Sequence, residues 1–303
     1  MNQQAPVLVP LDGSALAEQA LPVASSLAKR AGAALRLVHV HVPFAVDPIH
    51  VEGLPVLDEH LHSRRREHEQ AYLDGVRDRL AEDVPTTVGL IDGPVASALA
   101  EEARARRARL VVLTTHGRGG LERAWLGSVA DEMARVSPVP ILLVRPAATR
   151  PAPFRRIIVT LDGSALAEAI MEHAIAIARL DSGAEVVLLQ VVQPLPPVLV
   201  PQSVLVPESV KEEISHAGEK AAREYLEGVA GRVKAAGVNV RIRVDFAANV
   251  AAAIMDAAQA EEADLIALCT HGRSGLLRVA RGSVADKIVR ASPTPVLLFR
   301  PPE

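Results

Sequence analysis

The chain alternates short runs rich in apolar and β-branched residues with longer stretches in which apolar residues recur at helical spacing. In the first half, the short runs cover residues 7–11, 35–42, 86–91, 110–115 and 140–145. Such runs predict strands that are largely buried, as in a parallel sheet flanked by helices. Helical spacing is found between these runs, at residues 15–31, about 58–82, 94–107 and 127–136.

The same pattern is written twice. The segment VPLDGSALAE at 9–18 returns as VTLDGSALAE at 159–168, and the segment at 113–146 returns with substitutions at 268–301. A repeat whose period is a whole α/β unit predicts two domains of the same fold in tandem. The Pro- and Ala-rich stretch between the copies is typical of a linker. We expect domain 1 over 1–146, the linker over 147–155 and domain 2 over 156–303.

Five strands alternating with four helices in each copy predict an α/β fold with a doubly wound parallel sheet and helices on both faces. Such a sheet binds ligands beyond the carboxyl ends of its strands, where the strand order reverses. Asp12 and Asp162 follow the first strand of their copies, and a Thr-His-Gly-Arg sequence follows each fourth strand. We expect these two loops to meet at one edge of the sheet.

Composition narrows the class of protein. Of the 303 residues, 49% are hydrophobic but only 2% are aromatic, so we expect aliphatic cores and no base-stacking surface for single-stranded nucleic acid. The net charge of −3 gives no general attraction to nucleic acid or to an anionic membrane. Prolines interrupt the uncharged stretch 186–207, so we interpret it as a buried strand and a loop, not a membrane span. The single cysteine and the N-terminal residues, which lack the pattern of a signal peptide, favour a cytoplasmic protein.

The loop after the fourth strand has the residues of an anion site. In the first copy, Gly117 and Arg118 lie in this loop and Gly127-Ser128 opens the next helix. Glycine lets the backbone approach a ligand or take a positive φ, and a helix N-terminus offers unpaired N–H groups and a positive dipole end. The serine can add a hydroxyl donor and the arginine a positive charge. In a purely structural alternative, each serine and the aspartate three residues later form a capping box. The second copy has the same set: Gly272, Arg273, Gly282 and Ser283.

Other candidate residues also have structural alternatives. Asp12 and Asp162 precede Gly-Ser and could simply fix a turn or cap a helix. His39 and His41 share one face of a predicted strand, but no partner stands at a familiar zinc spacing, so we predict no dedicated metal site. Cys269 ends a predicted buried strand and is interpreted as an inert core thiol.

The combined spacing resembles that of the universal stress protein family, whose nucleotide-binding members carry G-x2-G-x9-G-S/T after the fourth strand. The later glycines and the serine match in both copies, whereas Thr114 and Cys269 stand at the first glycine. The resemblance implies that the first-strand aspartate contacts ribose and that the backbone of a second-strand valine recognises adenine. The nucleotide-binding residues that it implies are Pro10, Asp12, Val40, Thr114, Gly117, Arg118, Gly127, Ser128 and Val129 in the first copy, and Asp162, Val191, Cys269, Gly272, Arg273, Gly282, Ser283 and Val284 in the second.

The resemblance also implies the topology. It indicates a Rossmann-like sheet of the adenine nucleotide alpha hydrolase-like type, with strand order 3-2-1-4-5 in each domain. It further implies that the two copies form an internal pseudo-dimer through their last strands, near 140–145 and 295–300. This expectation agrees with physics, because these apolar strands would otherwise be exposed edges.

Three functions stay open from the sequence. The first is a stress-response or signalling protein that binds ATP, ADP or AMP, with any Mg²⁺ brought by the nucleotide, and acts through its conformation or through unidentified protein partners. The second is a slow Mg²⁺-dependent ATPase, although no P-loop is present and we predict no catalytic residue. The third is a ligand-free scaffold. A further association into homodimers is compatible with each.

Overall fold

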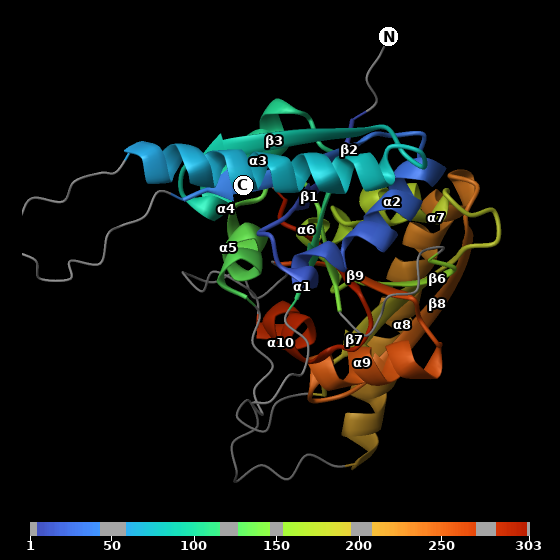
Figure 1. Cartoon of the computed structure of the whole chain (residues 1–303). Helices are drawn as coiled ribbons and strands as arrows, with labels where there is room; N and C mark the ends of the chain where they lie inside the picture. The colour runs from blue at the N-terminus through green and yellow to red at the C-terminus, as the bar shows by residue number, and fades with distance from the viewer. Residues whose placement is uncertain are drawn as a thin grey trace, which may run out of the picture. The chain divides into compact units, whose positions relative to one another are not determined.

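A computed structural model of the chain describes residues 5–42, 59–115, 127–145, 154–194, 208–270 and 283–301. The described residues form two compact units (Figure 1). Unit 1 comprises those up to residue 145, and unit 2 comprises those from residue 154 onward. The exact ends of the two domains and of the linker stay a prediction.

Unit 1 has a five-stranded sheet in which all neighbouring strands are parallel. The strand order is β3-β2-β1-β4-β5, which confirms the predicted order 3-2-1-4-5. The elements of unit 1 are β1 (Val7–Pro10), α1 (Ala15–Glu18), α2 (Leu21–Arg30), β2 (Leu35–His41), α3 (Glu59–Leu80), β3 (Thr86–Asp92), α4 (Val95–Ala105), β4 (Leu110–Thr114), α5 (Ser128–Val136) and β5 (Ile141–Val144).

Unit 2 repeats this topology, with strand order β8-β7-β6-β9-β10. The strand expected in the uncharged stretch is β7, and residues 195–207 of that stretch lie outside the described residues. The elements of unit 2 are β6 (Arg156–Thr160), α6 (Ala165–Glu168), α7 (Met171–Ala178), β7 (Glu185–Val192), α8 (Glu208–Ala235), β8 (Asn239–Phe246), α9 (Val250–Ala260), β9 (Leu265–Cys269), α10 (Ser283–Ala291) and β10 (Val296–Phe299).

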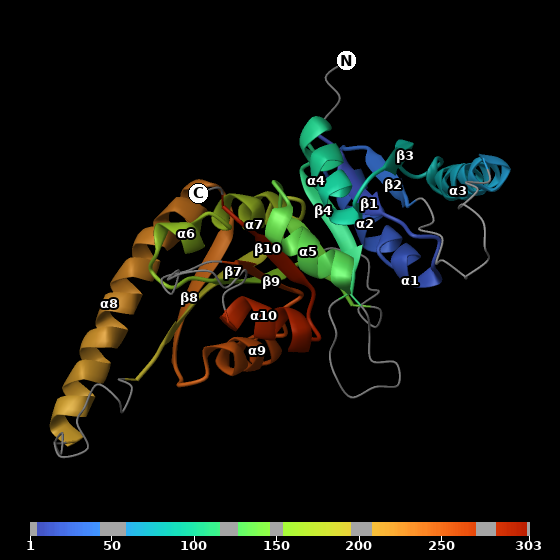
Figure 2. The same ribbon diagram turned by 90° about the vertical axis from the view of Figure 1, so that its left-hand side faces the viewer.

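The two sheets have the same register, so positions can be matched between the units. Val9 pairs with Leu37 in unit 1, and Val159 pairs with Leu188 in unit 2. Position 40 of β2 therefore matches position 191 of β7, as expected from the sequence. The matched helices are α3 and α8, which lie alongside β2 and β3 in unit 1 and alongside β7 and β8 in unit 2 (Figures 1 and 2).

Aliphatic side chains fill the core, as the composition predicts. The inner strands are almost fully buried, whereas β3 and β8 are mostly half-buried, and the largest fully buried side chains of the strands are leucine and isoleucine. Side chains alternate along a strand, so the two faces of β2 meet different helices. His39 and His41 point toward α3, where both contact Glu69, whereas Arg36 on the other face reaches Glu102 of α4.

One expected helix is two helices. Residues 15–31 were predicted as a single helix, but α1 ends at Glu18 and α2 begins at Leu21. The prediction was wrong because the backbone hydrogen bonds tighten from i→i−4 to i→i−3 at the end of the first helix in both units. In unit 1, Pro22 adds to the break, since it has no N–H to donate to the Glu18 carbonyl. The chain closes α1 with a tighter bond, from Gln19 N–H to the Leu16 carbonyl. Unit 2 has the same break between α6 and α7 without a proline.

No helix in the described ranges is both long enough and apolar enough to cross a membrane.

Candidate functional site

The turn after β1 is fixed by a small hydrogen-bond network. Asp12 Oδ1 accepts from the Ser14 backbone N–H (2.9 Å) and from the Ser14 hydroxyl (2.6 Å). The Ser14 hydroxyl oxygen in turn accepts from Ala17 N–H (3.1 Å) and caps α1. Gly13 has a φ of +86°, a conformation that favours glycine. Both Ser14 bonds use Oδ1, so Asp12 Oδ2 makes neither of them.

Unit 2 reproduces this turn. Asp162 Oδ1 accepts from the Ser164 N–H at 2.9 Å and from its hydroxyl at 2.6 Å, and Gly163 has a φ of +83°. The alternative that these aspartates fix a turn is therefore correct in both units. It does not exclude ligand contact, since one carboxylate oxygen is enough for the turn in unit 1.

Asp12 is kept ionised by its surroundings. Burial raises the pKa of Asp12, but hydrogen bonds from Ser14 and the nearby His39 outweigh burial and hold the pKa below its usual value. A negative carboxylate at the carboxyl end of β1 is suited to accept hydrogen bonds from ligand hydroxyls or to face a cation.

A cavity of about 630 Å³ lies at the carboxyl ends of β1, β2 and β4 of unit 1. It extends to α4 and the start of α5 on one side, through residues such as Leu99, and to α1 and α3 on the other, through residues such as Tyr72. Seven of the predicted nucleotide-binding residues line it together: Pro10, Asp12, Val40, Thr114, Gly127, Ser128 and Val129. The first-strand turn and the helix after the fourth strand therefore meet, as the topology predicts.

The start of α5 forms one wall of this cavity. Gly127 is the N-cap residue and makes no side-chain capping bond, so Ser128 is the first helical residue. The capping-box alternative is wrong for unit 1, because Ser128 lies one position too late to cap. Gly127 has a φ of −58°, so its backbone conformation does not require glycine. The N–H groups at the N-terminus of α5 adjoin the cavity, where an anion can accept hydrogen bonds from them.

The remaining predicted residues are less completely placed. In unit 2, Val191 lies near the end of β7, Cys269 ends β9, and Ser283 and Val284 open α10. Burial raises the pKa of the Cys269 thiol to about 12, which supports the interpretation of this residue as an inert core thiol. Outside the described residues lie Gly117, Arg118, Gly272, Arg273 and Gly282.

Sequence reasoning missed a tyrosine on the cavity wall. Tyr72 of α3 lines the cavity, and its hydroxyl donates to Glu18 Oε1 at 3.0 Å. Arg79 pairs with the other Glu18 oxygen at 2.6 Å. Unit 2 has the same contacts from Tyr225 and Arg232 to its matched glutamate. The signal was available, because Glu18 belongs to the repeated block at 9–18 and the chain contains only 2 tyrosines.

Sequence reasoning also missed a buried charged cluster beside the cavity. Glu69 of α3 is only 6% exposed and accepts from Arg65 at 2.8 Å. The same carboxylate lies 2.6 Å from His41 Nδ1 and 3.5 Å from His39 Nε2. Burial raises the pKa of Glu69, but the hydrogen bonds with His41 and Arg65 outweigh burial, so the pKa lies below its usual value. We call these four residues the β2–α3 cluster.

This cluster pairs charges and does not resemble a metal centre. No group of three or more His, Cys, Asp or Glu side chains suited to a metal ion occurs in the described part of the chain. The positive Arg65 against Glu69 further disfavours a cation at this point.

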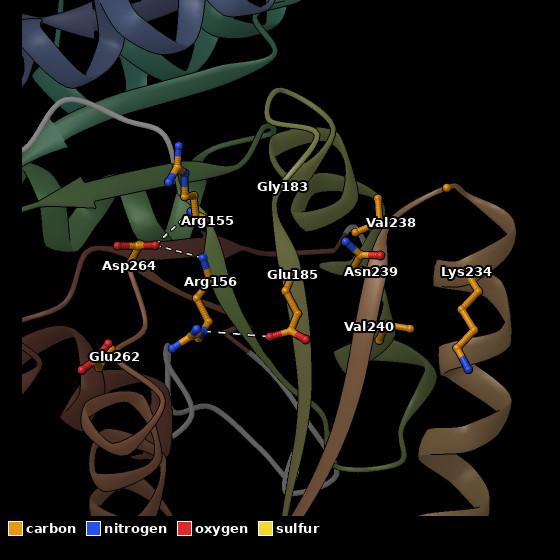
Figure 3. Close-up of a pocket in the computed structure, with 11 residues that line it drawn as sticks. Arg155, Arg156, Gly183, Glu185, Lys234, Val238, Asn239, Val240, Glu262 and Asp264 are labelled. Atoms are coloured by element: carbon orange, nitrogen blue, oxygen red, sulfur yellow. Dashed lines mark hydrogen bonds and ion pairs between the residues drawn. The ribbon is translucent and has the colours of Figure 1, made fainter.

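A second hollow, of about 950 Å³, lies in unit 2 at the amino ends of its strands (Figure 3). Some of its charged side chains are already engaged: Asp264 accepts from the backbone N–H groups of Arg155 and Arg156, both at 2.9 Å, and Arg156 lies 3.9 Å from Glu185. It contains none of the predicted residues and lies at the edge opposite to the one that binds ligands in parallel sheets. Its larger volume therefore does not make it the better candidate.

The comparisons with known proteins agree with this geometry. The sequence model of the Universal stress protein family matches residues 5–145 and again residues 153–300. The chain belongs to the universal stress protein family, in a tandem form with two copies of its α/β domain.

Individual relatives support both the family and the fold. A universal stress protein of Mycobacterium tuberculosis is 37% identical over 145 residues, 47% of this chain and 46% of the relative. The chain thus spans about half the length of the first curated relatives that it matches. A universal stress protein of Mycolicibacterium smegmatis is 28% identical over 302 residues, 97% of each chain. The crystal structure of a universal stress protein from Archaeoglobus fulgidus has a TM-score of 0.72 at 18% identity over 99% of each chain, and shows the same fold.

Proposed function

We propose that each unit binds an adenine nucleotide, ATP, ADP or AMP, at the carboxyl edge of its sheet. In this proposal the protein acts in a stress response or in signalling, and occupancy changes its conformation or its choice of protein partner. The observation that carries the proposal is the unit 1 cavity, which brings together Asp12, Val40, Thr114 and the start of α5 from segments far apart in the sequence.

The chemistry of the cavity matches the parts of a nucleotide. The unpaired N–H groups at the start of α5 are hydrogen-bond donors only, so they favour phosphate oxygens, which are acceptors. Asp12 can accept from ribose hydroxyls through the oxygen that Ser14 does not use. Val40 is 9% exposed at the end of β2, where backbone groups and an apolar side chain suit a purine. The volume of about 630 Å³ lies within the range of roughly 300–1,000 Å³ that is typical of small-molecule sites.

Calorimetry with the intact protein tests the proposal. ATP, ADP and AMP are titrated with and without Mg²⁺, and we expect at least one to bind with a dissociation constant below millimolar. Asp12→Asn keeps an oxygen that can accept from Ser14 but presents an amide in place of the free carboxylate oxygen. We expect this variant to fold normally and to lose affinity. No binding of any of the three nucleotides below millimolar would overturn the proposal.

Two finer points belong to the same proposal. Slow Mg²⁺-dependent hydrolysis is measured as phosphate release in the same samples, and its loss in the Asp12→Ala plus Asp162→Ala variant would add a weak ATPase activity. The single, buried Cys269 fits a reducing compartment, and we propose a cytoplasmic location on that basis.

A further inference from the structure

Both tyrosines of the chain occupy the same place in the two units. The sequence contains 2 tyrosines, and these are Tyr72 in α3 and Tyr225 in α8. Each hydroxyl donates to the last residue of the short helix that follows the first-strand aspartate turn, which we call the ligand turn. Tyr72 donates to Glu18 and Tyr225 donates to Glu168, both at 3.0 Å. The placement of the only tyrosines at matched positions with matched partners indicates a shared role for them.

The contact links the long helix to the turn that carries the aspartate. Ser14 accepts from the first turn of α1 and donates to Asp12, and α1 ends at Glu18, which holds Tyr72. Arg79, about two turns further along α3 on the same face, pairs with the second oxygen of Glu18. The Glu18 carboxylate therefore has both oxygens engaged by α3, and it sets the position of the tyrosine ring relative to Asp12.

The hydroxyl of Tyr72 stays protonated and stays engaged. Burial, the bond to Glu18 and the negative charges of Glu18 and Asp12 all raise the pKa of Tyr72 far above its usual value. Because the hydroxyl is held by Glu18, the part of Tyr72 that is left to meet a ligand in the cavity is its ring. Tyr72 and Asp12 both line the unit 1 cavity.

We propose that Tyr72 is a further ligand-contacting residue of unit 1, whose ring packs against the nucleoside part of the bound nucleotide, and that Glu18 is its positioning residue. The inference rests on the proposed nucleotide binding. Phosphate is excluded as the partner of Tyr72 because the hydroxyl is already used and because Asp12 and Glu18 place negative charge beside the ring. Phosphate belongs instead at the start of α5.

The two tyrosines make a direct experiment possible. The full-length protein is prepared with ring-labelled tyrosine, and its two ring signals are assigned by NMR with the Tyr72→Phe and Tyr225→Phe variants. On titration with ATP, the Tyr72 signal is expected to shift with the same midpoint as the calorimetric dissociation constant. The matched variant Tyr225→Leu is expected to leave this response unchanged.

Affinities then identify the part of the ligand that Tyr72 contacts. Tyr72→Leu is expected to weaken adenosine, AMP and ATP by the same factor, about tenfold for one lost aromatic contact. Tyr72→Phe keeps the ring and is expected to stay within about threefold of the parent protein. Glu18→Ala is expected to reproduce part of the loss, and Glu18→Gln to restore affinity, because an amide oxygen still accepts from the tyrosine.

The outcomes separate this inference from the proposed function. If ATP binds but the Tyr72 signal does not move at saturation, or if the loss in Tyr72→Leu grows with the number of phosphates, the inference is overturned and nucleotide binding stands. If no nucleoside or nucleotide binds to the parent protein, both fail. Unfolding midpoints of the variants show in each case that the protein is folded.

Discussion

The two units have the same fold and the same ligand turn, but they hold their second strand in different ways. In unit 1, Arg36 of β2 is buried against Glu102 of α4, with side chains 11% and 12% exposed. The matched positions in unit 2 are Val187 and Ala257, which are buried and apolar. Arg36 also covers Gly89, where a Cβ would lie 2.3 Å from the Arg36 Nη2.

The face of the second strand that packs against the long helix (α3 or α8) is also more charged in unit 1 than in unit 2. In unit 1 this face carries the β2–α3 cluster, whose buried carboxylate contacts two histidines and an arginine. The strand register matches Gln190 to His39 and Val192 to His41. The equivalent tyrosines of α3 and α8 match Gly218 to Arg65 and Ala222 to Glu69, so none of the matched residues in unit 2 carries a charge.

The same fold can therefore be stabilised by buried ion pairs or by apolar packing. Replacement of a whole buried pair by apolar residues is often neutral, whereas removal of one partner is costly because it leaves the other charge buried and alone. Unit 1 should therefore be more sensitive than unit 2 to single substitutions and to pH. Because Glu69, His39 and Arg65 also line the unit 1 cavity, the two proposed ligand sites are not electrostatically equivalent.

The largest expected effect comes from the pair on the α4 side. Glu102→Ala leaves the Arg36 guanidinium buried with one partner fewer, and we expect a loss of about 3 kcal/mol in the free energy of unfolding. Urea denaturation measures this loss. The control is Glu101→Ala, an exposed neighbour on the same helix, which should cost less than about 0.5 kcal/mol. Equal losses in the two variants would show that the buried pair does not stabilise unit 1.

A smaller effect is expected on the α3 side. Glu69→Gln removes the charge that faces Arg65 and the histidines, and should cost about 2 kcal/mol. The control is Glu219→Gln in α8, whose surface pair with Arg223 should contribute less than about 0.5 kcal/mol. Hydrogen exchange read separately for β2 and β7 would locate the effect, and a loss of protection in β7 alone would contradict the assignment.

The contribution of Glu69 to the stability of unit 1 should depend on pH. The pKa of Glu69 is lower in the folded protein than its usual value, so its contribution to stability is complete above the usual carboxylate pKa and is lost as pH falls through the lowered pKa. We expect the difference in unfolding free energy between the parent protein and Glu69→Gln to shrink toward zero in acid, as Glu69 becomes protonated. A difference that grows in acid would mean that the pKa shift has the opposite sign.

The smallest effect should be equal in the two units. Tyr72→Phe and Tyr225→Phe each remove one hydroxyl bond to a glutamate with the same 3.0 Å geometry, so each should cost about 1 kcal/mol in the free energy of unfolding. Chemical denaturation of the two single variants checks this symmetry. A loss in one variant only would show that the matched contacts are not equivalent in solution.

The sequence predicted the fold well because hydrophobic periodicity and the repeat report it directly. Short apolar runs bounded by turn residues are typical of buried strands, and the second copy repeats the blocks in which the first and fourth strands of the first copy end. The break between α1 and α2 was missed because helical spacing continues across it, although Pro22 was a local signal against a single helix.

The candidate site was only half predictable. Asp12, Gly127 and Ser128 could be found because glycine turns and helix starts have local sequence patterns. Tyr72 left a signal in the repeat, as one of only 2 tyrosines, but its contact with Glu18 forms only through the packing of α3 in unit 1. Glu69 left no such signal, because its histidine partners on β2 are at least 28 residues away in the sequence, as for His41, and no spacing rule connects them.

Under the proposed function, each unit holds one adenine nucleotide at the carboxyl edge of its sheet. Native mass spectrometry of the intact chain titrated with ATP tests this proposal, because it counts bound molecules. We expect two nucleotides per chain, one in Asp12→Ala and one in Asp162→Ala, and none in the double variant. Absence of bound nucleotide at millimolar ATP, or the same count in the double variant as in the parent protein, would contradict it.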